Sequence, residues 1–478
     1  MSWHRTYRDR VLGPDYDFAS KHLRHHFLDA LSAHVAGVAR LPQSSGEHTV
    51  QQVEALQRAL VMLHDVEPPV QGEDVPDLYF AIQGELKHRV GDATDLLRIG
   101  LSRNDLDMTV YKLRARELLL ETSERLLALR RAVIAQAGAH LGTVLIAQTH
   151  HQPGQPTTVA HYLSAVGDML TRDGERLTQA YVRLNRSPLG AAALAGSSYD
   201  LDREATAAAL GFTEPVGNTY DAVASADWQF DVVAASQCLA LNAGRLVCDL
   251  LAWAASGWYR LDDGLVQGSS IMPQKRNPVA LEHARTRFSR VLGAAGMVVY
   301  SSHNIPFADL NDFGPDVQGA LQMLHQQLAG GLDLLTACLE GGAFDGAKLA
   351  EAAAATDTTA TELADVLVRD TGMAFPAAHA VVGRLVAAAK ATNKPFTTLT
   401  PADLAAAGGP HLPAAALHEA VDPARFVERR RGLGMPATSA MAGRVAQQSE
   451  DVAAEAAALA GEKDRLLAAR TALRRAAA

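Results

Sequence analysis

The chain has few cysteines and few aromatic residues. Only three cysteines, Cys238, Cys248 and Cys338, occur among 478 residues, and no Cys-x-x-Cys pair accompanies them. An odd, small number of cysteines in apolar surroundings argues against a disulfide scaffold. It predicts buried thiols in a reducing compartment. Phe, Trp and Tyr together make up 5% of the residues. Alanine and leucine are abundant instead, and both lose little on entering a helix.

Positive charge and long apolar runs are also scarce. The formal net charge is −9, so the basic surface typical of a nucleic-acid-binding protein is not expected. No apolar run reaches the roughly 18 residues that a membrane span requires. The first residues contain no apolar segment of the kind found in signal peptides. We therefore expect a cytoplasmic protein with no nucleic-acid or membrane partner.

Four stretches poor in helix-breaking residues predict helices longer than the globular average. Residues 101–137 contain neither glycine nor proline, and an apolar residue recurs every seven positions, at Leu106, Leu113, Leu120, Leu127 and Ile134. Such a stripe must be buried against other helices. The other stretches are residues 219–257, 278–303 and 316–339. They predict a bundle extended across subunits, with no strand alternation of useful length.

We therefore expect an all-α protein of three helical domains: residues 1–101, a central long-helix bundle of residues 102–345, and residues 346–478. Shorter helices are expected at residues 53–63, 78–90, 360–370 and 376–389. An alanine-rich amphipathic stretch from residue 449 onward predicts a surface helix or a fraying tail.

Residues 268–278 read GSSIMPQKRNP and lie between two of the long helical stretches. Glycine, two serines and two prolines make a continuous helix unfavourable, so the segment is interpreted as a loop. It presents hydroxyl, ammonium and amide groups, which suit an anion clamp or a catalytic lid. Composition alone would equally fit a polar connector. The complete string, however, is highly specific.

This string resembles the signature loop of the fumarase/aspartase superfamily, and its MPQKxNP form is similar to argininosuccinate lyase. Fumarases and aspartases usually carry Gly or Ala where Gln274 stands. Other family-like segments follow in the expected order: SRND at residues 102–105, THHQ at 149–152, and stretches at 187–196 and 360–379. The resemblance covers roughly residues 78–400 and is weak before them.

The resemblance implies a fold, an assembly and a reaction. Members have an all-α fold with a tetrameric core, and each active site forms where central helices of three subunits meet. They remove a proton beside a carboxylate and expel an amine or hydroxide from the next carbon, which here implies a carbon–nitrogen lyase that releases fumarate. The doubly charged enediolate intermediate needs cationic and N–H donors on one side and a base on the other.

By the same resemblance, four residues carry the chemistry. Ser269 is the base, acting as an alkoxide that nearby donors stabilise. Lys275 supplies positive charge. His150 faces the leaving group, and Glu282 orients it and raises its basicity. Alone, each of these residues is more commonly structural, but their joint presence with the loop favours the catalytic interpretation.

The substrate-binding residues implied by the resemblance would hold the carboxylates of the succinyl part and surround the reacting carbons. They are Ser102, Arg103, Asn104, Thr149, Ser270, Gln274 and Asn277. No metal-ligand spacing and no glycine-rich phosphate loop is present. We therefore expect neither a metal nor a cofactor, and a small dicarboxylate such as fumarate as the ligand.

The chain departs from argininosuccinate lyase where the arginine half of the substrate binds. Residues 98–101 read RIGL where the family usually has HTGR, and the family's EDxH motif is replaced by PDLY at 76–79. Asp309, Gly314 and Val317 replace the usual Tyr, Gln and Lys. Sites built on such hydrogen bonds discriminate strongly. We therefore expect another N-substituted aspartate as substrate, as for ethylenediaminedisuccinate lyase. Asp309 could meet a cationic amine or be a solvated loop acid.

Three alternatives remain open from the sequence. The chain could be argininosuccinate lyase proper with a remodelled pocket, an enzyme for carbon–oxygen or another β-elimination on a succinyl substrate, or a catalytically silent structural relative. The retention of Ser269, His150, Lys275 and Glu282 argues against the last, because a structural copy has no reason to keep all four.

Overall fold

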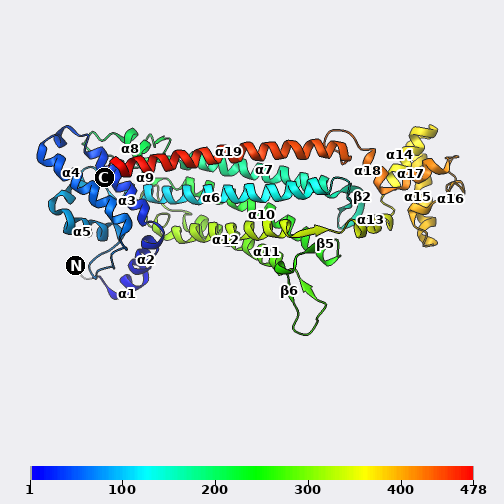
Figure 1. The fold of residues 1–478 in the computed structure, drawn as a ribbon, viewed down its shortest axis with the longest axis horizontal. Coiled ribbons are helices and arrows are strands. Elements are labelled where there is room, and N and C mark those ends of the chain that lie inside the picture. The colour runs from blue at the N-terminus through cyan, green and yellow to red at the C-terminus, as the bar shows by residue number, and fades with distance from the viewer. Residues whose placement is uncertain (1–2, 477–478) are drawn as a thin grey trace.

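The computed structural model describes residues 3–476, and the chain forms an elongated helical bundle (Figure 1). Met1 and Ser2, which belong to the segment where no signal peptide is expected, lie outside the described residues. The N-terminal part is built from short helices at one end of the bundle: α1 Arg5–Tyr7, α2 Gly13–His22, α3 Arg24–Val38, α4 Glu47–Met62 and α5 Leu78–Val90. The all-α class is confirmed.

The central bundle contains the long helices. Their bounds are α6 Arg103–Ala139, α7 Val159–Leu184, α10 Asp227–Ala255, α11 Val279–Ser301 and α12 Pro315–Glu340, with the short α8 Arg203–Ala209 and α9 Thr219–Ala224 between them. The expected helices at 101–137, 278–303 and 316–339 are therefore confirmed as α6, α11 and α12.

The expectation of one helix over residues 219–257 is wrong, because the chain leaves the helix between α9 and α10. Ser225 is extended, with ψ of 129°, and its hydroxyl donates to the Asp221 carboxylate. The Asp227 carboxylate then accepts from the Trp228 amide at 3.0 Å. Such local side-chain hydrogen bonds compete with the helical pattern and start a new helix.

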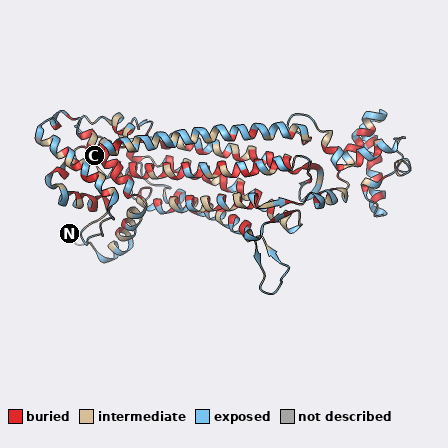
Figure 2. Cartoon of the chain, viewed as in Figure 1, coloured by how far each residue is buried: buried red, intermediate tan, exposed pale blue. Residues whose placement is uncertain are grey.

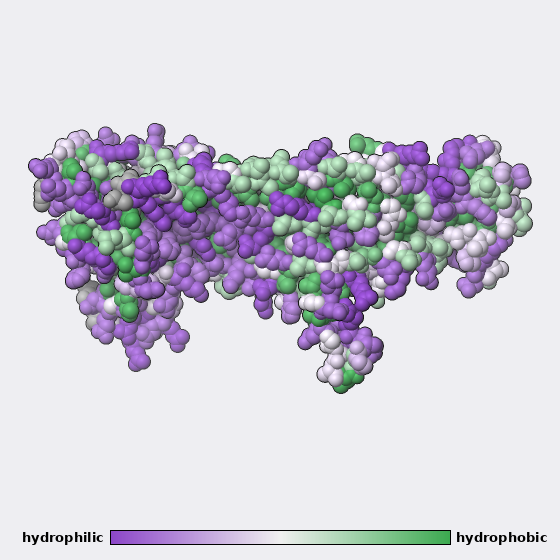
Figure 3. Space-filling model, in the orientation of Figure 1, coloured by the Kyte–Doolittle hydropathy of each residue, from purple (hydrophilic) through white to green (hydrophobic). Residues whose placement is uncertain are grey.

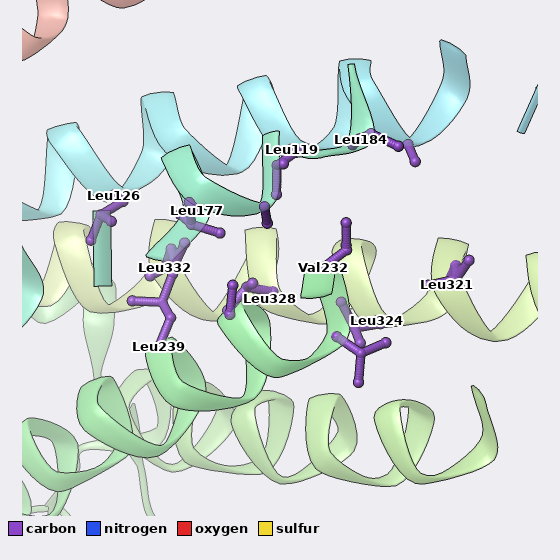
Figure 4. Packing of buried hydrophobic residues seen from close by; sticks show 14 of the residues in the cluster. Leu119, Leu126, Leu177, Leu184, Val232, Leu239, Leu321, Leu324, Leu328 and Leu332 are labelled. Atoms are coloured by element: carbon purple, nitrogen blue, oxygen red, sulfur yellow. The ribbon is translucent and has the colours of Figure 1, made fainter. Parts of the chain in front are cut away.

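Leucines, and one valine, seven residues apart pack the long helices against one another (Figure 4). The pairs Leu119 and Leu126, Leu177 and Leu184, Val232 and Leu239, and Leu321 and Leu328 lie on α6, α7, α10 and α12, and all are buried. This spacing is that of facing helices in a left-handed bundle. Gly331 lets α12 approach α11 closely, since a Cβ there would lie 2.6 Å from the Phe288 ring.

Short strands connect the helices, in contrast to the expectation that none of useful length exists. They form two-stranded sheets: β1 Val144–Thr149 with β2 Gln152–Thr158, β3 Arg186–Ser187 with β4 Glu214–Pro215, β5 Tyr259–Leu261 with β8 Gly342–Phe344, and β6 Gln267–Gly268 with β7 Arg276–Asn277. The β1–β2 hairpin is hard to recognise from sequence because Pro153, Gly154 and Pro156 interrupt β2 and weaken the usual strand signals.

A separate group of helices caps the other end of the bundle. They are α13 Gly346–Ala354, α14 Ala360–Thr371, α15 Phe375–Ala391, α16 Pro401–Ala406, α17 Ala414–Val421 and α18 Pro423–Glu428. Residues 363–421 have a hydrophobic cluster of their own, distinct from the core of the bundle. The expected helices at 360–370 and 376–389 are confirmed as α14 and α15.

The last helix, α19 Thr438–Ala476, returns along the whole bundle. Met441 and Leu473 belong to the core of the bundle, and the Arg474 guanidinium lies 3.0 Å from Asp29 of α3. The outward face of the helix is exposed (Figure 2). A fraying tail is therefore the wrong alternative, and these contacts place α19 with the bundle rather than with the rest of residues 346–478.

Within residues 3–476, one helix, α10, is long and apolar enough by composition to cross a membrane. Only 33% of its most apolar window is buried. Because α10 packs between α7 and α11 within the bundle, its remaining apolar face is exposed on the side of the bundle.

The ion pair between α6 and α19 is the basis of a first prediction. Arg130 is 2% exposed, and its Nη2 donates to Glu455 Oε1 at 2.9 Å and to Thr171 Oγ1 at 2.9 Å. Glu455→Ala leaves this buried cation without a counter-charge and should lower the free energy of unfolding by about 3 kcal/mol. Urea unfolding measures this, with the exposed Glu450→Ala on the same helix as control. Equal losses in both variants would contradict the prediction.

Candidate active site

The first group of site residues lies at the N-terminus of α6, where Ser102 is the N-cap. The Ser102 amide donates to Asp105 Oδ1 at 2.9 Å, and Ser102 Oγ accepts from the Asn104 amide at 3.4 Å. Asp105 Oδ2 also accepts from the Gly190 amide at 2.8 Å. Burial raises the pKa of Asp105 to about 7, against the effect of these backbone donors. Asp105 thus fixes residues 102–104 and docks the 187–196 loop beside them.

Arg103 and Asn104 face acidic side chains. Arg103 Nη1 lies 2.9 Å from Asp77 Oδ2, and Nη2 lies 3.5 Å from Asp107 Oδ2. The side-chain amide of Asn104 donates to the Asp309 carboxylate. Asp309 therefore contacts this group of residues, although its side chain is exposed. A substrate carboxylate at Arg103 would have to open one of its two ion pairs.

The second group lies at the tip of the β1–β2 hairpin, beyond the other end of α6. Thr149 pairs with Gln152, so His150 and His151 form the two-residue turn. Their φ values are 54° and 59°, the left-handed region that such turns require and that asparagine and glycine usually fill. Two histidines there carry backbone strain, which concentrates at functional sites. His150 is thus a turn residue rather than a helix-end residue.

The signature loop projects from the bundle between β6 and β7 (Figure 1). Ser269 Oγ accepts from the Met272 amide at 3.1 Å and faces the Ile271 amide at 3.4 Å. Two N–H donors on one hydroxyl oxygen stabilise negative charge there. Ser270, Gln274 and Lys275 are exposed on the loop, and Asn277 lies at its base in β7.

Arg276 anchors the base of the loop. Its guanidinium forms an ion pair with Asp263 and donates to the Leu261 carbonyl at 2.9 Å. Glu282 follows the loop in the first turn of α11 and is exposed. Among the described residues, no hydrogen bond or ion pair connects Glu282 with His150.

One chain therefore does not bring all the expected residues together. Ser102, Arg103 and Asn104 lie at one end of α6, and Thr149 and His150 follow its other end. A helix of 37 residues is roughly 55 Å long. The signature loop projects separately from the side of the bundle. The expected site residues of one chain therefore fall into three separate groups, or partial sites.

A cavity of about 500 Å³ lies beside Arg103 and includes residues that the sequence reasoning did not single out. Asp107 and Tyr111 line it together with Arg103. Their spacing of four residues along α6 places all three on one helix face, and this pattern could have identified them. Burial raises the pKa of Asp107 to about 7, aided by Asp77 and Asp309 and opposed by Arg103.

No group of three or more His, Cys, Asp or Glu side chains within residues 3–476 is placed to hold a metal ion.

Comparisons with known proteins identify the family. Residues 23–293 match the lyase family model, and residues 357–428 match the argininosuccinate lyase C-terminal model. The chain is 35% identical to argininosuccinate lyase of Methanoculleus marisnigri over 428 residues, covering 87% of this chain and 85% of that protein. It is 34% identical to argininosuccinate lyase 2 of Agrobacterium fabrum, covering 80% and 77%.

The chain belongs to the argininosuccinate lyase family. Within the fumarase/aspartase superfamily, it is an argininosuccinate lyase-like carbon–nitrogen lyase that releases fumarate.

Solved structures of the superfamily share its fold. An EDDS lyase variant with bound fumarate superposes with a TM-score of 0.86 at 25% identity, over 100% of this chain and 96% of that one. A class II fumarase of Schistosoma mansoni has a TM-score of 0.70 at 16% identity, over 84% and 90%, and shows the likeness of fold alone.

The raised pKa of Asp107 predicts how stability depends on pH. Folding raises this pKa from 3.8 to about 7, so the folded state favours the protonated carboxyl. The cost of ionisation is absent below about pH 4, grows through pH 4–7 and is complete above about pH 7, where it approaches about 4 kcal/mol. Asp107→Asn should therefore stabilise the protein at pH 8 more than at pH 5.

Urea unfolding at the two pH values measures this, with the exposed Asp65→Asn as the control for loss of one charge. The same gain at pH 5 and pH 8 would contradict a buried, ionising Asp107.

Proposed function

We propose that this lyase eliminates an amine from an N-substituted aspartate, with Ser269 as the base. The observation that carries the proposal is the position of Ser269 Oγ between the Ile271 and Met272 amides on a loop that also bears Lys275. An alkoxide needs such donors to exist at neutral pH. In the proposed step, it takes the proton from the carbon beside a carboxylate, and the carbon–nitrogen bond then breaks to give fumarate and the amine.

The remaining residues are proposed to divide between the two ends of the substrate. Lys275, Asn277 and Thr149 hold the carboxylate on which the enediolate develops, where charge-assisted donors act most strongly. Ser102, Arg103 and Asn104 bind the other succinyl carboxylate, and Ser270 and Gln274 complete the enclosing loop. His150 delivers a proton to the leaving amine, and Glu282 sets its tautomer.

This division requires several copies of the chain, because the three partial sites lie far apart in one copy. We propose a homotetramer in which each active site takes the α6 end, the hairpin tip and the signature loop from three different subunits. The exposed apolar side chains of the long helices support it. Leu241 of α10, Met297 and Tyr300 of α11 and Met323 of α12 are 45–81% exposed, and apolar patches gather on the middle of the bundle (Figure 3).

The substrate is proposed to be an N-substituted aspartate other than argininosuccinate. The residues that replace the usual Tyr, Gln and Lys cannot bind an arginine half in the same way: Asp309 is held by Asn104, Gly314 has no side chain, and Val317 is buried. Argininosuccinate itself is the runner-up, favoured by the 35% identity to an enzyme of that name. The structural neighbour EDDS lyase supports a different amine.

The reverse reaction tests this proposal. Purified protein is incubated with fumarate and a panel of amines and amino acids, and the loss of fumarate absorbance is followed. At least one amine should be consumed, and Ser269→Ala should lower the rate by about a thousandfold without altering the melting temperature. Ser256→Ala, an exposed serine at the end of α10, should leave the rate unchanged. Robust cleavage of argininosuccinate would overturn the proposed change of substrate.

Sharing of sites between subunits predicts complementation. Ser269→Ala and His150→Asn should each be inactive alone, whereas hybrids formed by co-refolding the two should recover part of the activity, because some sites then combine intact segments from different copies. Mass spectrometry under native conditions verifies that hybrids form. Verified hybrids with no recovered activity would show that one chain supplies both residues to a site.

A further inference from the structure

The cavity beside Arg103 contains an acidic pair that the proposed chemistry does not use. Asp15 lies in the first turn of α2 and Asp316 in the first turn of α12, and both line the cavity of about 500 Å³. Burial, together with the charge of Asp316, raises the pKa of Asp15. No described residue forms an ion pair with either carboxylate.

Basic groups do not balance the acids of this cavity. Arg103 is the basic side chain that lines it, and Asp77 and Asp107 already pair with Arg103. Asp15 and Asp316 are therefore in excess. Their positions at helix N-termini offset part of the repulsion through the helix dipole, but a cation placed between the two carboxylates would remove it.

A tyrosine without a hydrogen-bond partner among residues 3–476 also lines this cavity. Tyr111 is 6% exposed and lines the cavity, and no described residue makes a hydrogen bond to its hydroxyl. Burial, with the charges of Asp107 and Asp15, raises the pKa of Tyr111, so the hydroxyl stays protonated. A largely buried phenol usually has a hydrogen-bond partner, and this one is free to donate to a polar group in the cavity.

Other groups in the cavity also suit a cation. Asp77 Oδ2 is buried and has no hydrogen bond of good geometry, although Arg103 lies within ion-pair distance. The rings of Trp3 and Tyr7, 5.8 Å apart, form part of the cavity wall. Aromatic faces attract ammonium groups.

We infer that this cavity receives the amine half of the substrate and that Asp15 and Asp316 bind a second, distal cationic group on that amine. This inference rests on the proposed function, because Arg103, which lines the cavity, is proposed to bind a carboxylate of the succinyl half. The leaving group is then a diamine or polyamine without a carboxylate of its own. A zwitterionic amino acid such as arginine would bring its carboxylate against unbalanced acids and is disfavoured.

Matched amines test the inference. 1,4-Diaminobutane has a distal ammonium where 4-amino-1-butanol has a hydroxyl, and the two are similar in length. In fumarate addition at pH 8, kcat/KM for the diamine should exceed that for the amino alcohol by about tenfold, the factor expected from one charge-assisted contact. Asp15→Asn and Asp316→Asn should each reduce this ratio to below about threefold. Asp17→Asn, an exposed acid on α2 that does not line the cavity, should preserve it.

Calorimetric binding of the two amines to the enzyme, without fumarate, separates this inference from the proposed function. If no amine consumes fumarate, the proposed reaction fails, yet tighter binding of the diamine that depends on Asp15 and Asp316 would still support the cation site. Equal binding of both amines to the wild-type protein, or a preference unchanged in both variants, would overturn the inference even if fumarate addition proceeds.

Discussion

Continuous burial of leucine along α6, α7, α10 and α12 is the constraint on which the rest of the structure depends. The seven-residue spacing keeps one face of each helix against its neighbours for its full length. Helices of this kind make a stiff, elongated molecule, so residues at opposite ends of α6 are held far apart. The three groups of polar residues do not meet within one chain, and this separation is why we propose that several chains combine to complete a site.

Each partial site is prepared by local interactions that do not depend on the others. Asp105 fixes the start of α6 through the Ser102 and Gly190 amides, the His150–His151 turn is set by the β1–β2 register, and Arg276 anchors the signature loop. This division of labour explains why the polar residues sit at helix ends, turns and loops, while the long helices contribute rigidity.

Much of this architecture can be predicted from sequence, because the heptad period of α6 reports its buried face directly. The break between α9 and α10 cannot, since it results from side-chain hydrogen bonds of Ser225 and Asp227 that any helix surface could also carry. The β1–β2 hairpin is hidden by the prolines of β2. At the site, Asp107 and Tyr111 could be found from Arg103 by their spacing of four residues along α6. That Asp15 and Asp316 line the same cavity depends on the tertiary fold, which brings residues 301 positions apart in the sequence to one place.

The electrostatics of the two ends of the substrate also constrain each other. Cations such as the proposed Lys275 stabilise an enediolate. Nearby carboxylates would destabilise the enediolate unless a positive charge lies between the carboxylates and the enediolate. A distal cation on the leaving amine supplies that charge from the substrate itself. The replacement of the family's Tyr, Gln and Lys and the presence of Asp309 near Arg103 are both consistent with the proposed preference for a distal cation over an amino acid end with its own carboxylate. In the proposed site, selectivity would come from the attraction between the two acids and a distal cation, which an uncharged amine cannot supply.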